Sequence, residues 1–300
     1  GVMLAVAAAA GVRVLLATRT VEGAGANAGI TAAEYCRTQG VMILRYLAML
    51  ILPSGYSVDP PVEVATPLPG ALAWALVIGM AAVALRRFSR AREGFWFLAG
   101  LVLLLPSSSI FPVADLAVDR RMYIPLAAFS AAAALLIRNW RWPAAAALCI
   151  AFAAISFFRT QVWLSERTLW EEAARLAPSK LRPKIQLARV SEPPRALEIL
   201  RDAKNLAPED PRVASELGRV HLEMKNPARA LQEYGRALAL DPNDARAVSN
   251  RGAVLLLLAQ KEAARADFER ALRMDPCLAD ARNNLSRLGI AVPEARGCRE

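Results

Sequence analysis

Charged and aromatic side chains gather in one short stretch of this 300-residue chain, Pro106–Pro125. The stretch lies between two apolar segments and carries Arg120, Arg121, Tyr123, Asp115 and Asp119. A guanidinium group is permanently charged and binds phosphate through two parallel hydrogen bonds, to which a tyrosine hydroxyl can add a donor. Alternatively, one of the aspartates pairs with an arginine only to hold the loop. The stretch therefore predicts an anion site or a structural ion pair, and the two roles are compatible.

Long apolar segments surround this stretch and must position it. Four of them are predicted to be membrane spans, Leu68–Leu85, Gly94–Pro112, Met122–Ile137 and Pro143–Phe158. A full crossing needs about 20 residues, and tryptophans favour the membrane–water interface. Three tryptophans stand at segment ends, Trp140, Trp142 and Trp163. Several such segments in a row indicate a polytopic membrane region rather than a soluble core.

Two further apolar segments precede these spans. Val2–Ala17 is short and is interrupted by an arginine, and Thr18–Arg37 reads as a link. Thr38–Pro53 carries Arg45 among its apolar residues and is too short for a comfortable crossing. We expect an interfacial or re-entrant helix there, with a true span as the alternative.

Arginines between the spans predict the orientation. Arg86–Glu93 and Arg138–Trp142 carry an excess of positive charge, which is typical of cytoplasmic loops. The link Pro112–Arg121 and everything after Phe158 then lie outside the cytoplasm. Residue usage rich in Ala, Arg and Leu suggests a bacterium with a GC-rich genome, so the expected location of the predicted spans is a bacterial inner membrane.

The last part of the chain repeats every 34 residues, as Pro208, Pro242 and Pro276 show. Small and aromatic residues share this period: Ala196, Ala230 and Ala264; Leu200, Tyr234 and Phe268; Ala203, Ala237 and Ala271; Gly218 and Gly252. This pattern is the tetratricopeptide signature. Each unit is then a helix pair in which small residues allow close approach, the aromatic fills the gap to the next pair, and the proline ends the second helix.

The first unit is irregular, because Pro178 precedes Pro208 by only 30 residues. We expect the deletion to shorten the first helix of that unit. Ser165–Ala177 should form a helix that joins the membrane region to the repeats, and Leu278–Leu288 a helix that closes the stack. The predicted fold is all-α: a polytopic membrane region (1–158), a connecting helix (159–178) and a tetratricopeptide (TPR) α-solenoid (179–300).

Two sets of residues resemble those of a known family. Leu105–Phe129 (LPSSSIFPVADLAVDRRMYIPLAAF) is followed by further spans, by the motif W-x-S-x-x-x-L-W at Trp163–Trp170, and then by the repeats. This order resembles the transmembrane-and-tetratricopeptide O-mannosyltransferase-like proteins and their bacterial relatives. An earlier segment is also similar to theirs, at Thr38, Gln39, Arg45, Tyr46, Leu47, Pro53 and Asp59.

The resemblance implies a GT-C glycosyltransferase that takes a sugar from a polyprenyl-phosphate donor outside the cytoplasm. The donor phosphate would bind Arg120 and Arg121, with Tyr123 and Asp115 beside them. The family's catalytic base belongs to an early loop that nothing in this chain matches. The chain begins inside an apolar run, so we expect it to be the C-terminal part of a longer protein. The alternative is a non-catalytic membrane scaffold whose TPR groove binds a protein partner.

Other polar residues carry weaker signals. Ser107, Ser108 and Ser109 are expected to end a helix rather than to contact substrate. Arg45 and Tyr46 are expected to extend to the membrane interface, with lipid headgroups as the alternative. Asp59 is expected to be an exposed loop acid rather than a second acid of the site. His221, the single histidine, is expected to be packed or to line a groove.

Several functions find no support in the sequence. One histidine cannot build a histidine metal cluster, and the four cysteines (Cys36, Cys149, Cys277, Cys298) have no metal-ligand spacing. A disulfide between Cys277 and Cys298 and two free thiols remain open alternatives. The net charge of +10 does not indicate a nucleic-acid partner, because the arginines are dispersed along the chain. No cofactor is expected.

Overall fold

A computed structural model describes residues 30–52, 54–88, 92–104, 116–117, 119–291 and 298, with the backbone alone for Asp119 and Arg120. The chain divides into two compact units, residues 1–164 and 165–300. The predicted apolar segment Val2–Ala17 lies outside the described residues. Within them the protein is all-α, as the sequence predicts.

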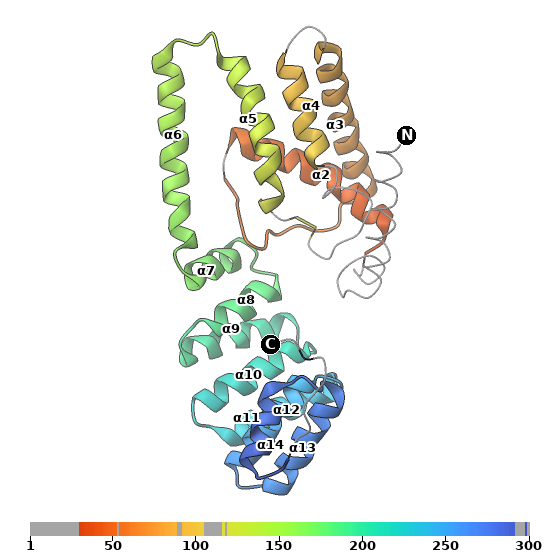
Figure 1. Ribbon diagram of the computed structural model, residues 1–300, viewed down its shortest axis with the longest axis vertical. Coiled ribbons are helices and arrows are strands. Elements are labelled where there is room, and N and C mark those ends of the chain that lie inside the picture. Colours follow the sequence, from red (N-terminus) through yellow and green to blue (C-terminus); the bar gives the residue numbers. More distant parts are fainter. Residues whose placement is uncertain are drawn as a thin grey trace. The chain divides into compact units, whose positions relative to one another are not determined.

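The first unit is built of apolar helices: α2 (Ala32–Ile51), α3 (Pro67–Phe88), α4 (Arg92–Leu104), η3 (Asp119–Met122), α5 (Tyr123–Ile137), α6 (Trp142–Thr160) and η4 (Gln161–Trp163). Figure 1 shows α3, α4 and α5 side by side, with α2 running across them. Their shared core includes Tyr46 of α2, Val77 of α3, Leu104 of α4 and Phe129 of α5. This core fixes α2 against the helices on either side of the predicted arginine stretch.

Helix α2 starts earlier than the sequence analysis expected. Residues up to Arg37 were predicted to form a link, whereas the helix begins at Ala32. Thr31 and Glu34 form a capping box, in which the Thr31 hydroxyl accepts from the Glu34 N–H and the Glu34 carboxylate accepts from the Thr31 N–H at 2.9 Å. These two bonds satisfy backbone donors that would otherwise be free in the first turn, so they stabilise the earlier start.

Two helices of the described part are long and apolar enough, by length and composition, to cross a membrane. They are α3 and the continuous helical segment Trp142–Trp163. Helix α5 is apolar, but its 15 residues span only about 22 Å at 1.5 Å per residue, which is less than a hydrocarbon core of about 30 Å. Helix α4 is described for 13 residues, and the remainder of the predicted span Gly94–Pro112 lies outside the described part.

The second unit is a row of short helices, each packed against the next: α7 (Glu166–Leu176), α8 (Leu181–Arg189), α9 (Pro193–Leu206), α10 (Pro211–Glu223), α11 (Pro227–Leu240), α12 (Ala245–Leu257), α13 (Lys261–Met274) and α14 (Ala279–Arg287). Helices α7 and α14 lie where the sequence analysis predicted a connecting and a closing helix. Helix α8 has nine residues, against 13 in α10 and in α12. The expected shortening of the first unit is therefore confirmed.

The same contacts recur between the repeats. Gly218 lies against the ring of Tyr234, where a Cβ atom would be 3.0 Å from three ring carbons. Gly252 meets Phe268 in the same way, with the nearest ring carbon at 2.9 Å. Each aromatic thus covers the glycine of its own unit, and Tyr234 also contacts Val254 of the next unit, as predicted.

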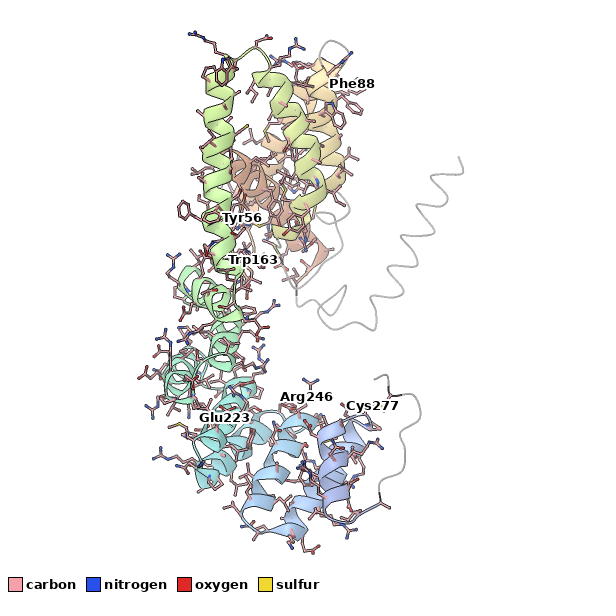
Figure 2. The ribbon with its side chains drawn as sticks, turned by 60° about the vertical axis from the view of Figure 1, so that its left-hand side comes forward. Tyr56, Phe88, Trp163, Glu223, Arg246 and Cys277 are labelled. Atoms are coloured by element: carbon pink, nitrogen blue, oxygen red, sulfur yellow. A yellow bond between two sulfur atoms is a disulfide. The ribbon has the colours of Figure 1, made fainter. Side chains whose placement is uncertain are left out.

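An arginine of the second helix ties each unit to the preceding one. Arg236 donates to the carbonyl of Pro208, and Arg270 donates to the carbonyl of Pro242 at 2.7 Å. The two bonds lie one repeat apart. At the end of the stack the structure forms the disulfide between Cys277 and Cys298, one of the two alternatives that the sequence left open (Figure 2 labels Cys277).

Candidate functional site

The predicted arginine site is described in part. Asp115 and the three serines Ser107–Ser109 lie outside the described residues. Asp119 and Arg120 belong to η3, and their side chains are not described. Arg121 is half-buried, and its Nη1 donates to the carbonyl of Leu116 at 3.4 Å. Tyr123 opens α5 and is 75% exposed, so its hydroxyl is accessible to a ligand.

Gln39 of α2 donates to the same carbonyl. Its Nε2 donates to the Leu116 oxygen at 3.1 Å, so that α2 and Arg121 share one acceptor. The side chain is fully buried, and its Oε1 atom has no hydrogen-bond partner among the described residues. Through this bond the buried amide of Gln39 holds the backbone at Leu116, to which Arg121 also donates. The sequence pointed to Gln39 only through the family resemblance; its signal was a glutamine inside an apolar helix.

The loop after α2 is held to that helix by polar contacts. Arg37 Nε donates to the Ala65 carbonyl at 2.6 Å, and the Ala65 N–H donates to the Thr38 hydroxyl at 3.0 Å. Arg45 Nη2 donates to the Gly55 carbonyl at 2.9 Å. These bonds satisfy the loop's backbone groups and allow it to pack against the helix.

Two sequence expectations are corrected by this loop. Asp59 was expected to be an exposed acid, but it is 8% exposed. It is covered because the loop is fastened along α2 at both of its ends. Tyr46 was expected at the membrane interface, but it is fully buried in the core of the first unit, and Arg45 binds the loop backbone instead of extending away from it.

Arg159, near the end of α6, was not identified from the sequence. Its Nη2 donates to the Tyr56 carbonyl at 2.6 Å, and its guanidinium carbon lies 5.9 Å from the centre of the Tyr56 ring. Figure 2 shows Tyr56 beside the end of α6 that leads to Trp163. The contact fastens the end of this helix to the same loop that buries Asp59.

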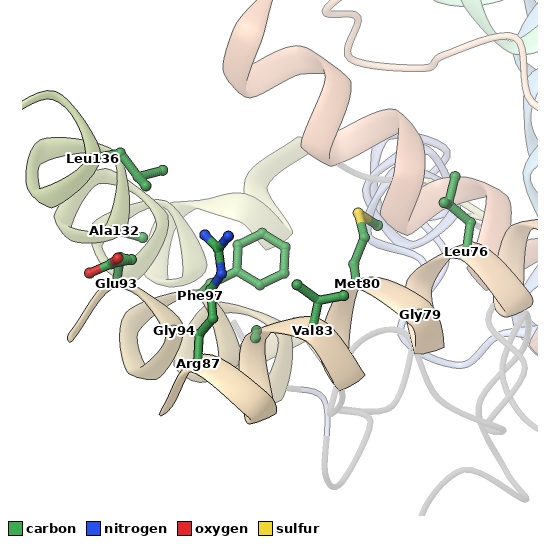
Figure 3. A pocket seen from close by; sticks show the side chains of 11 residues that line it. Leu76, Gly79, Met80, Val83, Arg87, Glu93, Gly94, Phe97, Ala132 and Leu136 are labelled. Atoms are coloured by element: carbon green, nitrogen blue, oxygen red, sulfur yellow. The ribbon is translucent and has the colours of Figure 1, made fainter. Parts of the chain in front are cut away.

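A pocket of about 440 Å³ lies away from this site, between α3, α4 and α5. Its walls are apolar, and Arg87 and Glu93 stand in its lining, as Figure 3 shows. These two residues belong to the loop that the sequence analysis assigned to the cytoplasmic side. The pocket could hold an apolar chain, but it includes none of the predicted site residues.

A second pocket, of about 220 Å³, lies in the repeat unit between α9, α10 and α11. Its lining is Leu197, Arg201, Lys204, Leu217, His221, Arg229, Gln232 and Glu233. Leu217 and His221 are buried and form its floor, whereas Arg201 and Arg229 are exposed at its rim. Lys204 Nζ lies 3.0 Å from Glu233 Oε1. The expectation that His221 lines a groove is confirmed.

The electrostatics of this pocket favour an anion. Burial lowers the pKa of His221, and the positive charges of Arg229, Arg201 and Lys204 lower it further, while Glu233 acts in the opposite direction. His221 is therefore held toward its neutral form, by burial first and by the cations around it second. In the described residues, no group of three or more His, Cys, Asp or Glu side chains could hold a metal ion.

Comparison with known proteins identifies the repeats. A family model described as tetratricopeptide repeat matches residues 187–245 and 215–279. Similar solved structures include MamA (17% identity, 41% of this chain and 77% of that chain, TM-score 0.36). They also include the first TPR of Spaghetti (RPAP3) bound to the HSP90 peptide SRMEEVD (23% identity, 36% of this chain and 86% of that chain, TM-score 0.34). A third is the Arabidopsis OM64 TPR domain (23% identity, 36% of this chain and 91% of that chain, TM-score 0.35). No curated protein matches the chain.

Proposed function

We propose that the chain is embedded in a membrane by its first unit and binds a protein partner outside the cytoplasm through its TPR array. The observation that carries this proposal is α6, which buries none of its 19 residues. It presents large apolar side chains such as Ile150, Phe157 and Phe158 away from the protein. An apolar surface of this extent is unfavourable in water and favourable in lipid.

The location of the array outside the cytoplasm is supported by two observations. Arg138 and Arg141 flank the turn between α5 and α6, which is the charge pattern of a cytoplasmic loop, and a crossing by α6 then leads outside. The Cys277–Cys298 disulfide closes the end of the array, and disulfides persist in oxidising compartments. The TPR match supports partner binding, because stacked helix pairs create extended binding surfaces.

Fractionation and a reporter test this proposal. The full chain should remain with membranes after alkaline carbonate extraction, and a reporter fused after Glu300 that is active only outside the cytoplasm should be active. Release by carbonate would contradict membrane embedding. A reporter active only in the cytoplasm would contradict the orientation while leaving the embedding intact.

A second candidate function is sugar transfer from a polyprenyl-phosphate donor. It is favoured by the convergence of Arg121 and Gln39 on the Leu116 carbonyl and by the exposure of Tyr123, two residues after Arg121. In this proposal Arg120 and Arg121 hold the donor phosphate and stabilise the charge that develops on it as the sugar leaves. Gln39 positions the Leu116 segment that Arg121 contacts. No residue of the described part of the chain is assigned as the base that takes the acceptor proton.

Binding of polyprenyl phosphate and sugar transfer by the full-length protein test this candidate. Arg121→Ala should weaken binding of polyprenyl phosphate at least 10-fold, whereas Arg138→Ala, which removes an exposed arginine from the α5–α6 turn, should change it less than 2-fold. Arg121→Lys should restore it in part, because a lysine keeps the charge but loses the two-pronged geometry. If Arg121→Ala leaves both donor binding and sugar transfer unchanged, the candidate is wrong.

A further inference from the structure

The pocket between α9, α10 and α11 contains more positive than negative charge. Three cations line it, Arg201, Lys204 and Arg229, against one carboxylate, Glu233. Lys204 pairs with that carboxylate. No ion pair of Arg201 or Arg229 is found among the described residues, although both are at the rim of a pocket about 220 Å³ in size. Two guanidinium groups are therefore available to an anion that enters the pocket.

The repeat itself shows that the fold does not need these cations. One unit later, 34 residues along the chain, Gly235, Leu238 and Ala263 occupy the positions of Arg201, Lys204 and Arg229. The packing contacts of the two places are nevertheless the same, with a glycine under an aromatic ring in each. Because the fold forms without positive charge at the equivalent positions of the next unit, the charges of Arg201, Lys204 and Arg229 can serve ligand recognition.

The carboxylate in the lining narrows the kind of anion. Glu233 accepts from Lys204 through Oε1, and its buried Oε2 lies 4.0 Å from Arg236 Nη1. A polyanion such as a nucleic-acid backbone, which carries a charge at every unit, is repelled by this carboxylate. A peptide can instead place a single side-chain carboxylate among uncharged backbone groups. The apolar surface of Leu197 suits an apolar neighbour of the acidic side chain.

We propose that this pocket binds an acidic segment of the protein partner, with an Asp or Glu carboxylate held by Arg201 and Arg229. The proposal rests on the proposed partner-binding role of the TPR array and adds the chemistry of the partner. The planar guanidinium groups provide paired N–H donors for a carboxylate, and the pocket removes part of the competing water. The partner is thus expected to present Asp or Glu beside an apolar residue.

Selection of peptides on the full chain in detergent tests the proposal. A phage-displayed library of random octapeptides is selected on the wild-type chain and on the double variant Arg201→Gln/Arg229→Gln. The matched control is Arg246→Gln/Arg273→Gln, which removes the same charge from exposed positions of the array outside the pocket (Figure 2 labels Arg246). Thermal unfolding should show that all three proteins remain folded.

The expected result is enrichment of peptides that contain Asp or Glu, with affinity at least 10-fold lower for the pocket variant and less than 2-fold lower for the control. Enrichment of peptides without an acidic excess would overturn the acidic-segment proposal and leave partner binding standing. Equal losses of peptide affinity in the pocket variant and the control would also overturn it, because the peptides would then be attracted by the positive charge of the array as a whole. Displacement of the peptides by vesicles of anionic lipid would point to a membrane surface instead. Enrichment of no peptide would contradict both this proposal and the partner-binding role.

Discussion

The array presents the same junction twice, once at α9–α10–α11 and once at α11–α12–α13. Both junctions place a glycine under an aromatic ring and an arginine on a proline carbonyl. They differ in charge. The first has two arginines, Arg201 and Arg229, for which the described residues provide no ion pair, while the second joins Arg251 and Asp267 through two bonds of 2.7 and 2.6 Å. Shared contacts therefore build the solenoid, and the places where the repeats differ are where its specificity is expected.

The largest expected effect tests the shared part of the comparison. Tyr234→Ala and Phe268→Ala should each lower the free energy of unfolding by about 3–5 kcal/mol, because each removes a buried ring and leaves a cavity over a glycine. Denaturant unfolding of the purified chain measures both. Leu257→Ala, at an exposed position, is the control and should stay within about 0.5 kcal/mol.

Unequal losses in the free energy of unfolding would contradict the view that the two junctions share their packing. If one aromatic variant proved several-fold less destabilising than the other, the two junctions would not be packed alike. Their charge difference could then be a consequence of packing rather than of recognition.

The second prediction concerns the two carboxylates at equivalent positions. Asp267→Ala should destabilise the array by about 2–3 kcal/mol, because it leaves Arg251 without its two-pronged partner in a poorly hydrated place. Glu233→Ala should cost about 1 kcal/mol or less, because Glu233 has one hydrogen bond, to the more exposed Lys204, and a looser contact of 4.0 Å with Arg236. Unfolding by denaturant gives both values. A larger loss of stability for Glu233→Ala than for Asp267→Ala would contradict the interpretation that the carboxylate of the second junction is the one that stabilises the array.

The third prediction sharpens the recognition side of the comparison. Glu233→Gln keeps an acceptor oxygen in the pocket but removes the carboxylate that opposes an incoming anion. The affinity for acidic peptides should rise about 3-fold, which is about 0.7 kcal/mol. Fluorescence anisotropy with a labelled peptide from the selection measures the change. A fall in affinity would mean that the charge of Glu233 is itself needed for binding.

How much the sequence predicted differs between the units for a physical reason. In the array each structural position occurs in successive copies, so the period alone predicted the helix pairs, the short α8 and the closing α14. The charges of the pocket were not predicted, because Arg229 is distant in sequence from Arg201 and Lys204 and none of the three follows the 34-residue period. They become a group only when α9 and α11 stack on either side of α10.

In the first unit, composition predicted that α3 to α6 are helices but not which polar groups they bury. The Thr31–Glu34 capping box was present in the sequence as Thr-Ala-Ala-Glu and could have moved the start of α2. The burial of Asp59 and the bond from Arg159 to Tyr56 could not be foreseen, because each joins segments that are distant in sequence. Polar contacts of this kind follow from tertiary packing and leave no local pattern.

The smallest expected effect is a pH dependence at His221, which occupies the position of Leu255 in the next unit. Burial and the charges of Arg229, Arg201 and Lys204 lower its pKa, against the opposing charge of Glu233. The unfolded chain therefore binds a proton near the ordinary pKa of about 6.5, while the folded chain does not until lower pH. Stability should accordingly fall as the pH drops through this range.

His221→Leu installs the residue of the second junction and should reduce this loss of stability, which thermal unfolding at pH 8, 6 and 5 measures. If the wild-type chain and His221→Leu lose stability equally on acidification, that loss comes from groups other than His221.

An acidic peptide in the pocket adds negative charge beside His221 and should raise its pKa. Binding should therefore tighten as the pH drops toward 6 in the wild-type chain and not in His221→Leu. If peptide affinity is the same at pH 6 and pH 8 in the wild-type chain, the anion does not enter far enough to reach the floor of the pocket. In that case recognition would be confined to the arginines at its rim.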